Sequence, residues 1–247
     1  MTSRPPAAVS SAQTIRPPLN ASLRLRSIVE SPRAIPLVAA IAAWLAVCYG
    51  IWHSAIEHSL TPGEGVVAMP DRWPADGAVD RAIERAGDRP TLVLCMHPRC
   101  PCTAASIETL GPVCIAAGNS PKVVLLVKIP PAAGSEWLET DGVRAARELP
   151  GAEVVADCGG ELARRFGAAT SGTVFLFSPS GECLFGGGVT ASRGHAGENA
   201  GLQMLRQAFA TGEPAGGAAS PVFGCPLYEP PRISIASGGG VEVKYDR

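Results

Sequence analysis

A run of 19 uncharged, mostly apolar residues constrains this chain most strongly. Residues 34–52 read AIPLVAAIAAWLAVCYGIW. As a helix, this run is about 28 Å long, which is enough to cross the core of a bilayer. Trp44, Tyr49 and Trp52 lie in its C-terminal half, where aromatic side chains can reach the far membrane interface. The sequence therefore predicts one N-terminal transmembrane helix, over residues 34–53.

The charges on either side of this run predict its orientation. The 33 preceding residues contain five arginines and the single acid Glu30, whereas the first lysine or arginine after the run is Arg72. By the positive-inside rule, the N-terminus is cytoplasmic and everything after residue 53 lies across the membrane. A cleaved signal peptide is the alternative, but AVCYG is a poor cleavage site. A lipid anchor on Cys48 is disfavoured by the bulky Val47 before it.

Composition limits the rest of the chain to one ordinary domain with flanks. The net charge is −1, which gives no indication of a nucleic-acid partner. Charged residues are scarce at 17%, whereas 28 Gly and 23 Pro are many, which is typical of a compact core with long unstructured ends. We expect five parts: a disordered cytoplasmic tail 1–33, the transmembrane helix 34–53, a linker 54–77, a domain 78–211, and an extended tail 212–247 with an apolar docking segment 221–228.

Within the domain, apolar strand-like runs alternate with helical patterns. The expected elements are a helix 78–86, a strand 90–96, a helix 102–110 ended or kinked by Gly111 and Pro112, a strand 122–129, a helix 135–148 with Ser135 as N-cap, a strand 152–157, a helix 160–168, a hairpin 172–188 and a closing helix 197–210. This order predicts an α/β domain, in which a mixed sheet has helices on both faces.

Two cysteines stand between the first strong strand and its helix, in HPRCPCTAAS. The start of a helix offers unpaired N–H groups and the positive end of a dipole, which lower cysteine pKa values. Arg99 adds a cation that is expected to lower the pKa of Cys100 further. We assign Cys100 as the attacking thiol, because it lies further out on the loop, and Cys102 as the resolving thiol. The reverse assignment stays open, as does a pair of idle thiols.

A disulfide between Cys100 and Cys102 would close over Pro101 alone. Such a link is geometrically tight, and strain raises the reduction potential of a disulfide. If the bond forms, it is therefore easily reduced, which suits a disulfide donor or an isomerase.

The order of elements around these cysteines resembles the thioredoxin fold over residues 78–211. Within that superfamily the chain is similar to a bacterial group of membrane-anchored, RedB-like proteins. The blocks that carry this resemblance are HPRCPCTAAS, FGAATSGTVFLF, LFGGGVTASRGHAGENAG and VFGCPL. The resemblance implies a thioredoxin-like domain on the periplasmic side of a bacterial cytoplasmic membrane.

The chain departs from the thioredoxin pattern at two places. Thioredoxin-like proteins have a cis-proline that faces the cysteine pair, and the matching position here is Gly172, followed by Thr173. Glycine there is expected to leave a more open, more adaptable backbone. The tryptophan usual before the first cysteine is also absent, and the segment His97-Pro98-Arg99 takes its place.

A metal site is the main alternative to redox chemistry. Cys100, Cys102 and Cys225, with either His97 or His195, are soft ligands suited to Cu(I) or zinc. Copper-delivery proteins with a thioredoxin fold carry a Cys-x3-Cys pair. This chain lacks that spacing, because Cys95 and Cys100 are five residues apart and Cys95 lies in an apolar strand. Our leading expectation is therefore a domain without a cofactor.

Two further segments are candidates for a role at the site. Cys225, in the apolar island PVFGCPLY, is either a third thiol, a metal ligand or part of an anchoring plug. The loop 190–199 concentrates polar residues that could bind a substrate or partner, with Arg193 suited to a carboxylate. Its members are Arg193, His195, Glu198 and Asn199. The alternative is a structural loop that caps the last helix.

The other cysteines of the domain are expected to belong to its core. Cys114, Cys158 and Cys183 lie in or beside predicted core elements, and Cys158 and Cys183 could pair outside the cytoplasm.

Three functions follow from these patterns. The leading one is a membrane-tethered thiol–disulfide oxidoreductase that acts on extracytoplasmic protein thiols or disulfides. The second is a module that binds or delivers copper or zinc. The third is a redox-inactive interaction domain that presents the loop 190–199 to a membrane partner.

Overall fold

The structure, a computed structural model, describes residues 34–66, 69–75, 77–131, 134–216, 219–228, 232–235 and 241–244. The chain divides into two compact units between residues 54 and 55. The expected cytoplasmic tail, residues 1–33, lies outside the described residues.

The apolar run forms the helix α2 (Ala34–Leu60). Its segment Ile35–Leu60 contains an 18-residue stretch with a mean hydropathy of 2.0 that is not buried, so the helix is long and apolar enough to cross a membrane. The helix continues past its expected end at residue 53, because no glycine or proline stands in the chain between residue 53 and Pro62. Residues 54–60 of the expected linker are therefore helical.

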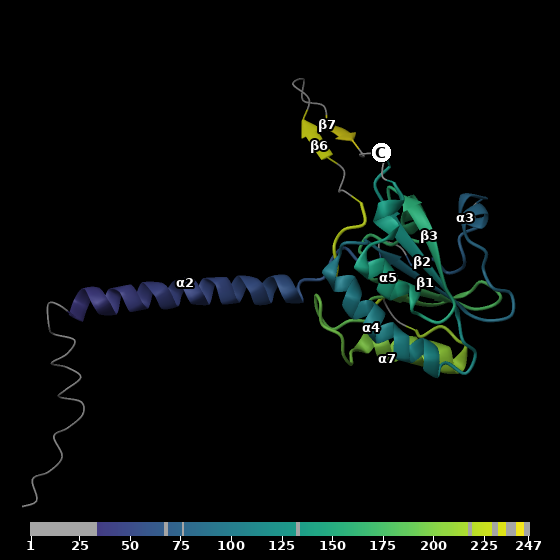
Figure 1. Cartoon of the computed structure of the whole chain (residues 1–247), viewed down its shortest axis with the longest axis horizontal. Helices are drawn as coiled ribbons and strands as arrows, with labels where there is room; N and C mark the ends of the chain where they lie inside the picture. Colours follow the sequence, from purple (N-terminus) through teal and green to yellow (C-terminus); the bar gives the residue numbers. More distant parts are fainter. Residues whose placement is uncertain are drawn as a thin grey trace, which may run out of the picture. The chain divides into compact units, whose positions relative to one another are not determined.

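The domain is built on a five-stranded sheet in the order β3-β2-β1-β4-β5 (Figure 1). Its strands are β1 (Thr91–Met96), β2 (Lys122–Ile129), β3 (Ala152–Cys158), β4 (Thr173–Phe177) and β5 (Cys183–Gly187). The first three run parallel, β4 is antiparallel to β1, and β5 is antiparallel to β4. Every residue of the central strand β1 is buried, as its unbroken apolar sequence predicts. The expected mixed sheet is confirmed.

Helices cover both faces of this sheet. Leu92, Leu94 and Met96 of β1 pack with α4, α5 and α7, whereas Val93 and Cys95 pack with α3 and α6. The helices on the first face are α4 (Pro101–Ala116), α5 (Asp141–Arg147) and α7 (Ala200–Thr211), and those on the second are α3 (Gly77–Ala82) and α6 (Glu161–Arg165). Figure 1 shows α4 next to α7, and residues of both helices line one cavity.

Two helix boundaries differ from expectation. The helix α4 runs through Gly111 and Pro112 to Ala116, because Val113 and Cys114 beyond the proline are buried in the core. The expected helix 135–148 is divided into a short 3₁₀ helix, Ser135–Leu138, and α5. The N-cap of α5 is Thr140, whose side chain accepts a hydrogen bond from the Val143 N–H, so Ser135 does not cap it.

The segment expected to be a linker packs on the domain. Val66 forms an isolated β-bridge with Ala168, and Arg72 forms one with Glu182. The Trp73 ring meets the edges of two core rings, Phe166 and Phe177, with centroids 5.1 Å away in each case. These contacts tie the chain after α2 to the sheet.

The start of the tail packs on the domain as well. Val222 and Leu227 are 1% and 0% exposed, and Ser220 forms a β-bridge with Gly187. Further along, where an extended coil was expected, the strands β6 (Arg232–Ile235) and β7 (Val241–Lys244) pair in an antiparallel ladder. Residues 217–218, 229–231, 236–240 and 245–247 of the expected tail lie outside the described residues.

The suggested pairing of Cys158 with Cys183 is wrong. Cys158 ends β3 and Cys183 begins β5, and these are the two edge strands of the sheet. Four strand spacings separate them, or about 19 Å, whereas disulfide-bonded cysteines have Cα atoms less than about 7 Å apart. Both thiols are free.

Candidate thiol site

A tight turn carries the chain from β1 into α4 and places Cys100 at the start of the helix. The Cys100 N–H donates to the His97 carbonyl at 3.0 Å, and the buried Pro98 accepts a hydrogen bond from Thr140 Oγ1 at 3.0 Å. Cys100 is the N-cap, with φ −86° and ψ 115°. Pro101 follows at the first helical position, where its missing N–H costs nothing.

The tail segment 219–228 docks beside this turn through its backbone. The Ser171 N–H donates to the Cys225 carbonyl, and the Leu227 N–H donates to the Ala169 carbonyl, both at 2.8 Å. Thr170 and Pro226 form the antiparallel bridge between them. The tail thus pairs, like a short strand, with the turn that precedes β4, and this pairing brings the Cys225 thiol to Cys100.

Glycine at position 224 is required for this docking. A Cβ added there would lie 1.9 Å from the Ser171 carbonyl oxygen, which is backbone and cannot move aside cheaply. The absence of a side chain at Gly224 therefore lets the two backbones approach closely.

Hydrogen bonds to the Cys100 sulfur favour its thiolate. Burial raises the pKa of Cys100. Four hydrogen bonds lower it, and their donors are the Cys225 thiol, the Cys225 N–H, the Thr103 hydroxyl and the Cys102 N–H. The net pKa of Cys100 lies below that of an ordinary thiol. Two of these donors belong to the tail and two to the first turn of α4. The thiolate is therefore stabilised by two segments far apart in the sequence.

A chain of hydroxyl groups supports one of these donors. The His97 N–H donates to Ser171 Oγ at 2.8 Å, and Ser171 Oγ lies 2.8 Å from Thr103 Oγ1. If the Thr103 hydroxyl donates to Cys100, Thr103 accepts from Ser171, whose own oxygen accepts from His97. Both hydroxyl side chains are buried, so the orientation of Thr103 is fixed without help from water.

The other two thiols of this cluster remain protonated. Burial, the charge on Cys100 and a hydrogen bond to Cys100 raise the pKa of Cys102, and Arg193 partly opposes them. Burial and the hydrogen bond to Cys100 raise the pKa of Cys225 to about 12. Cys100 is thus the anionic member. The predicted reason for choosing it does not hold, because Cys100 and Cys102 are equally buried, at 6% and 7% exposed.

Arg193 holds the tail instead of offering a free guanidinium. Its Nε donates to the His58 carbonyl at 3.1 Å, its backbone N–H donates to the Ser59 carbonyl at 3.0 Å, and a terminal nitrogen donates to the Gly224 carbonyl. The expected carboxylate site is therefore occupied by main-chain oxygens. From this position, the positive charge also lowers the pKa values of Cys102 and Cys225.

The expected effect of Arg99 on Cys100 is not found. The Arg99 guanidinium lies over the Trp137 ring, 4.1 Å from its centroid, and the groups that shift the Cys100 pKa are burial and hydrogen bonds. His97 accepts the Arg99 N–H on Nδ1 at 3.2 Å. Burial, then Lys128 and Arg99, lowers the pKa of His97, so this ring is neutral at neutral pH.

Gly172 forms a closed turn rather than an open, adaptable backbone. Its φ is +93°, and its N–H donates to the Cys95 carbonyl at 2.8 Å. Proline could supply neither that φ nor that donor, which explains its absence here. Thr173 completes the turn, since its hydroxyl donates to the Thr170 carbonyl at 2.6 Å.

The remaining polar residues of the loop 190–199 serve the loop itself. His195 Nδ1 lies 3.1 Å from Ser192 Oγ, and Glu198 forms an ion pair with Arg206 at 2.7 Å. Asn199 is the N-cap of α7 and accepts the Leu202 N–H at 3.0 Å. Among the described residues, no group of three or more His, Cys, Asp or Glu side chains is placed to hold a metal ion.

The cysteines of the core differ from Cys100 because burial raises their pKa values. Burial raises the pKa of Cys95 well above its usual value, that of Cys114 to about 11 and that of Cys183 to about 12. These three thiols are therefore inert side chains of the core.

Thr103 and Ser171 are the site residues that sequence reasoning missed. Both stand next to residues that the motifs singled out, Cys102 and Gly172. The available signal was a hydroxyl in the first helical turn and another one just before a buried strand, although nothing local shows that the two meet.

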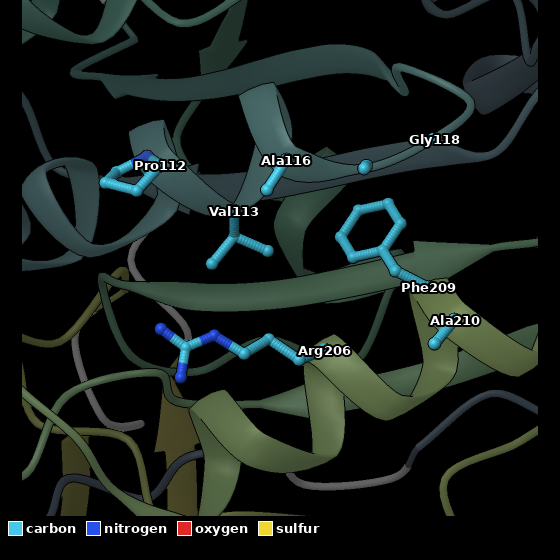
Figure 2. A pocket seen from close by; sticks show the side chains of 8 residues that line it. Pro112, Val113, Ala116, Gly118, Arg206, Phe209 and Ala210 are labelled. Atoms are coloured by element: carbon cyan, nitrogen blue, oxygen red, sulfur yellow. The ribbon is translucent and has the colours of Figure 1, made fainter.

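The apolar cavity between α4 and α7, about 470 Å³, is not part of this site. Figure 2 shows Val113 and Phe209 facing it from opposite helices, with Arg206 along its edge. None of its lining residues carries a thiol.

Replacing Thr103 with valine tests the hydroxyl chain. Thr103→Val keeps the shape but removes a donor to the Cys100 thiolate, so the pKa of Cys100 rises. The ultraviolet absorbance of the thiolate, titrated against a Cys100→Ala background, measures this shift. Thr109→Val is the matched control, because Thr109 Oγ1 donates to the Ala105 carbonyl within α4. An unchanged titration in Thr103→Val would contradict the assigned donor.

Gly224→Ala tests the docked tail. The overlap with the Ser171 carbonyl displaces residues 219–228, at a cost of about 1–3 kcal/mol in stability. Because two donors leave with the tail, the pKa of Cys100 rises. Urea unfolding and the same thiolate titration measure both effects. Gly118→Ala, where an added Cβ meets nothing within 4 Å, is expected to change neither quantity.

Comparisons with known proteins assign no family to this chain. No protein-family model and no curated protein matches the chain. A hypothetical protein from Sinorhizobium meliloti is 23% identical with a TM-score of 0.47, over 68% of this chain and 94% of its own. A secreted Mycobacterium tuberculosis disulfide oxidoreductase homologous to E. coli DsbE is 17% identical, with a TM-score of 0.36, over 51% of this chain and 82% of its own. StoA from Bacillus subtilis is 19% identical, with a TM-score of 0.35, over 50% of this chain and 83% of its own.

The strand order, the helices on both faces of the sheet and the cysteine pair at the start of α4 make this domain thioredoxin-like.

Proposed function

We propose that this protein is a thiol–disulfide oxidoreductase, tethered to the membrane by α2, that acts on the extracytoplasmic side through Cys100 and Cys102. One observation supports this most directly. A buried cysteine has a lowered pKa because hydrogen bonds converge on its sulfur. A thiolate at neutral pH is the reactive form in disulfide exchange, whereas ordinary buried thiols are inert.

In the proposed reaction, the Cys100 thiolate attacks one sulfur of a partner protein's disulfide. The partner's S–S bond breaks, its other sulfur leaves as a thiolate, and Cys100 is joined to the partner in a mixed disulfide. A second thiol then attacks Cys100 and releases the partner. Cys102 is the nearest in sequence, and its pKa falls at this stage, because the charge on Cys100 that raised it has been consumed.

The same hydrogen bonds favour one direction of transfer. Groups that stabilise the Cys100 thiolate stabilise the reduced protein, and a stabilised reduced form makes a disulfide a stronger oxidant. The reaction above is then favoured in reverse, so that the oxidised protein donates its disulfide to partner thiols, or the protein isomerises partner disulfides.

The membrane location is supported by α2 and by the charges around it. The helix contains a stretch long and apolar enough to cross a membrane, and five arginines precede it, whereas the first lysine or arginine after the apolar run is Arg72. The positive-inside rule then places the domain outside the cytoplasm, where disulfide chemistry is common.

Exchange activity is expected to depend on Cys100 and not on the cysteines of the core. Cys100→Ala reduces the exchange with a dye-labelled peptide disulfide to the uncatalysed rate, whereas Cys114→Ala leaves it unchanged. In the wild-type protein the rate falls as the pH drops through the lowered pKa of Cys100, because the protonated thiol does not attack. Stopped-flow fluorescence over a pH series measures both. Full activity in Cys100→Ala would exclude this function.

The exposed Cys158 provides a test of orientation. A membrane-impermeant maleimide is expected to label Cys158 in intact spheroplasts, with Cys158→Ala as the control for other thiols. Labelling that appears only after lysis would place the domain in the cytoplasm.

A further inference from the structure

The three thiols at the start of α4 are not equivalent, and their arrangement raises the question of which one resolves Cys100. Cys102 is fixed in the first turn of α4. A disulfide from it to Cys100 would close over Pro101 alone, a geometry that strains the helix start. Cys225 belongs to a separate segment, so a disulfide between Cys225 and Cys100 would not be confined to such a short ring.

The contacts around Cys225 hold it ready for that bond. Its thiol and its N–H both donate hydrogen bonds to the Cys100 sulfur. The backbone on either side is fixed by the hydrogen bonds between Ser171 and Cys225 and between Leu227 and Ala169. Buried Val222 and Leu227 flank it as apolar anchors.

These contacts also cover the site. With the tail docked, Cys100 and Cys102 are 6% and 7% exposed, and Cys225 is the most accessible thiol of the cluster. A partner disulfide therefore reaches Cys100 only when residues 219–228 move away. When the tail returns, it brings Cys225 back to the sulfur of the mixed disulfide.

We propose that Cys225 is the thiol that resolves Cys100, so that the oxidised protein contains a Cys100–Cys225 disulfide closed over the docked tail. This inference rests on the proposed function and assigns one of its steps to a residue outside the Cys-Pro-Cys pair.

The resolving step is a thiol–disulfide exchange. In the mixed disulfide Cys100 carries no charge, so its part in raising the pKa of Cys225 is lost. The Cys225 thiol gives up its proton and attacks the Cys100 sulfur, the bond from Cys100 to the partner breaks, and the partner's sulfur leaves as a thiolate that takes up a proton. Two electrons have then passed from Cys100 and Cys225 to the partner's disulfide, which is the oxidant. Arg193 favours the Cys225 thiolate, and docking makes the attack intramolecular.

The location of the disulfide is read directly by peptide mapping. The full-length protein in detergent micelles is oxidised with glutathione disulfide, blocked and digested with trypsin. Cys100 and Cys102 fall in one tryptic peptide, residues 100–122, whereas Cys225 falls in another, residues 207–232. We expect these two peptides to be cross-linked until a reductant is added. The link persists in Cys102→Ala and in Cys114→Ala, and it is lost in Cys100→Ala and in Cys225→Ser.

The mixed disulfide with glutathione identifies the resolving thiol independently. It is expected to accumulate in Cys225→Ser but not in Cys102→Ala. Cys225→Ser keeps a hydrogen-bond donor and nearly the same volume, and its circular dichroism spectrum is compared with that of Cys158→Ser to verify folding.

A disulfide within residues 100–122 and accumulation only in Cys102→Ala would overturn this inference while leaving the proposed function intact. If Cys100 forms neither the mixed disulfide nor the cross-link, both proposals fail.

Discussion

Ionising a buried sulfur is unfavourable unless donors replace the lost water, and this requirement explains the arrangement of the site. Cys100 is nearly inaccessible, yet hydrogen bonds from Thr103, Cys102 and Cys225 lower its pKa. A helix start alone offers N–H groups, and here a side-chain hydroxyl and a second segment of chain add to them. The nucleophile thus depends on tertiary contacts, not on the Cys-Pro-Cys motif alone.

The docked tail affects both the reactivity of Cys100 and its accessibility. Residues 219–228 supply two donors to Cys100 and at the same time cover it. In the proposed cycle, movement of the tail would expose the sulfur and remove two of its donors, so access for a partner would be gained with a loss of thiolate stabilisation. Arg193 links this equilibrium to the end of α2, because it donates to the His58 and Gly224 carbonyls together.

The sequence predicted the fold well because the core strands are strongly patterned. The run TLVLCM was expected to be a central buried strand and is β1, with every residue buried. The hairpin around SPSGE was likewise recognisable from its turn residues. Helix ends were less predictable. Core packing of residues beyond Pro112 extends α4, and Thr140, not Ser135, caps α5. Local sequence propensity reveals neither feature.

Much less of the site could be predicted, because its contacts join residues far apart in sequence. The motif located Cys100 and Cys102 but gave the wrong reason for their difference, since Arg99 turns to Trp137 and both thiols are buried. The chain from His97 through Ser171 to Thr103 spans 74 positions, and Cys225 lies further still. Only the folded backbone brings these groups together.

The most direct test of this account is an NMR titration of the reduced protein with ¹³C-labelled cysteine, in which each Cβ shift reports its own thiol. Stabilisation by converging donors predicts that Cys100 ionises first, below the pKa of an ordinary thiol, while Cys102 and Cys225 stay protonated. Ionisation of Cys100 at or above the pKa of Cys102 would contradict the account.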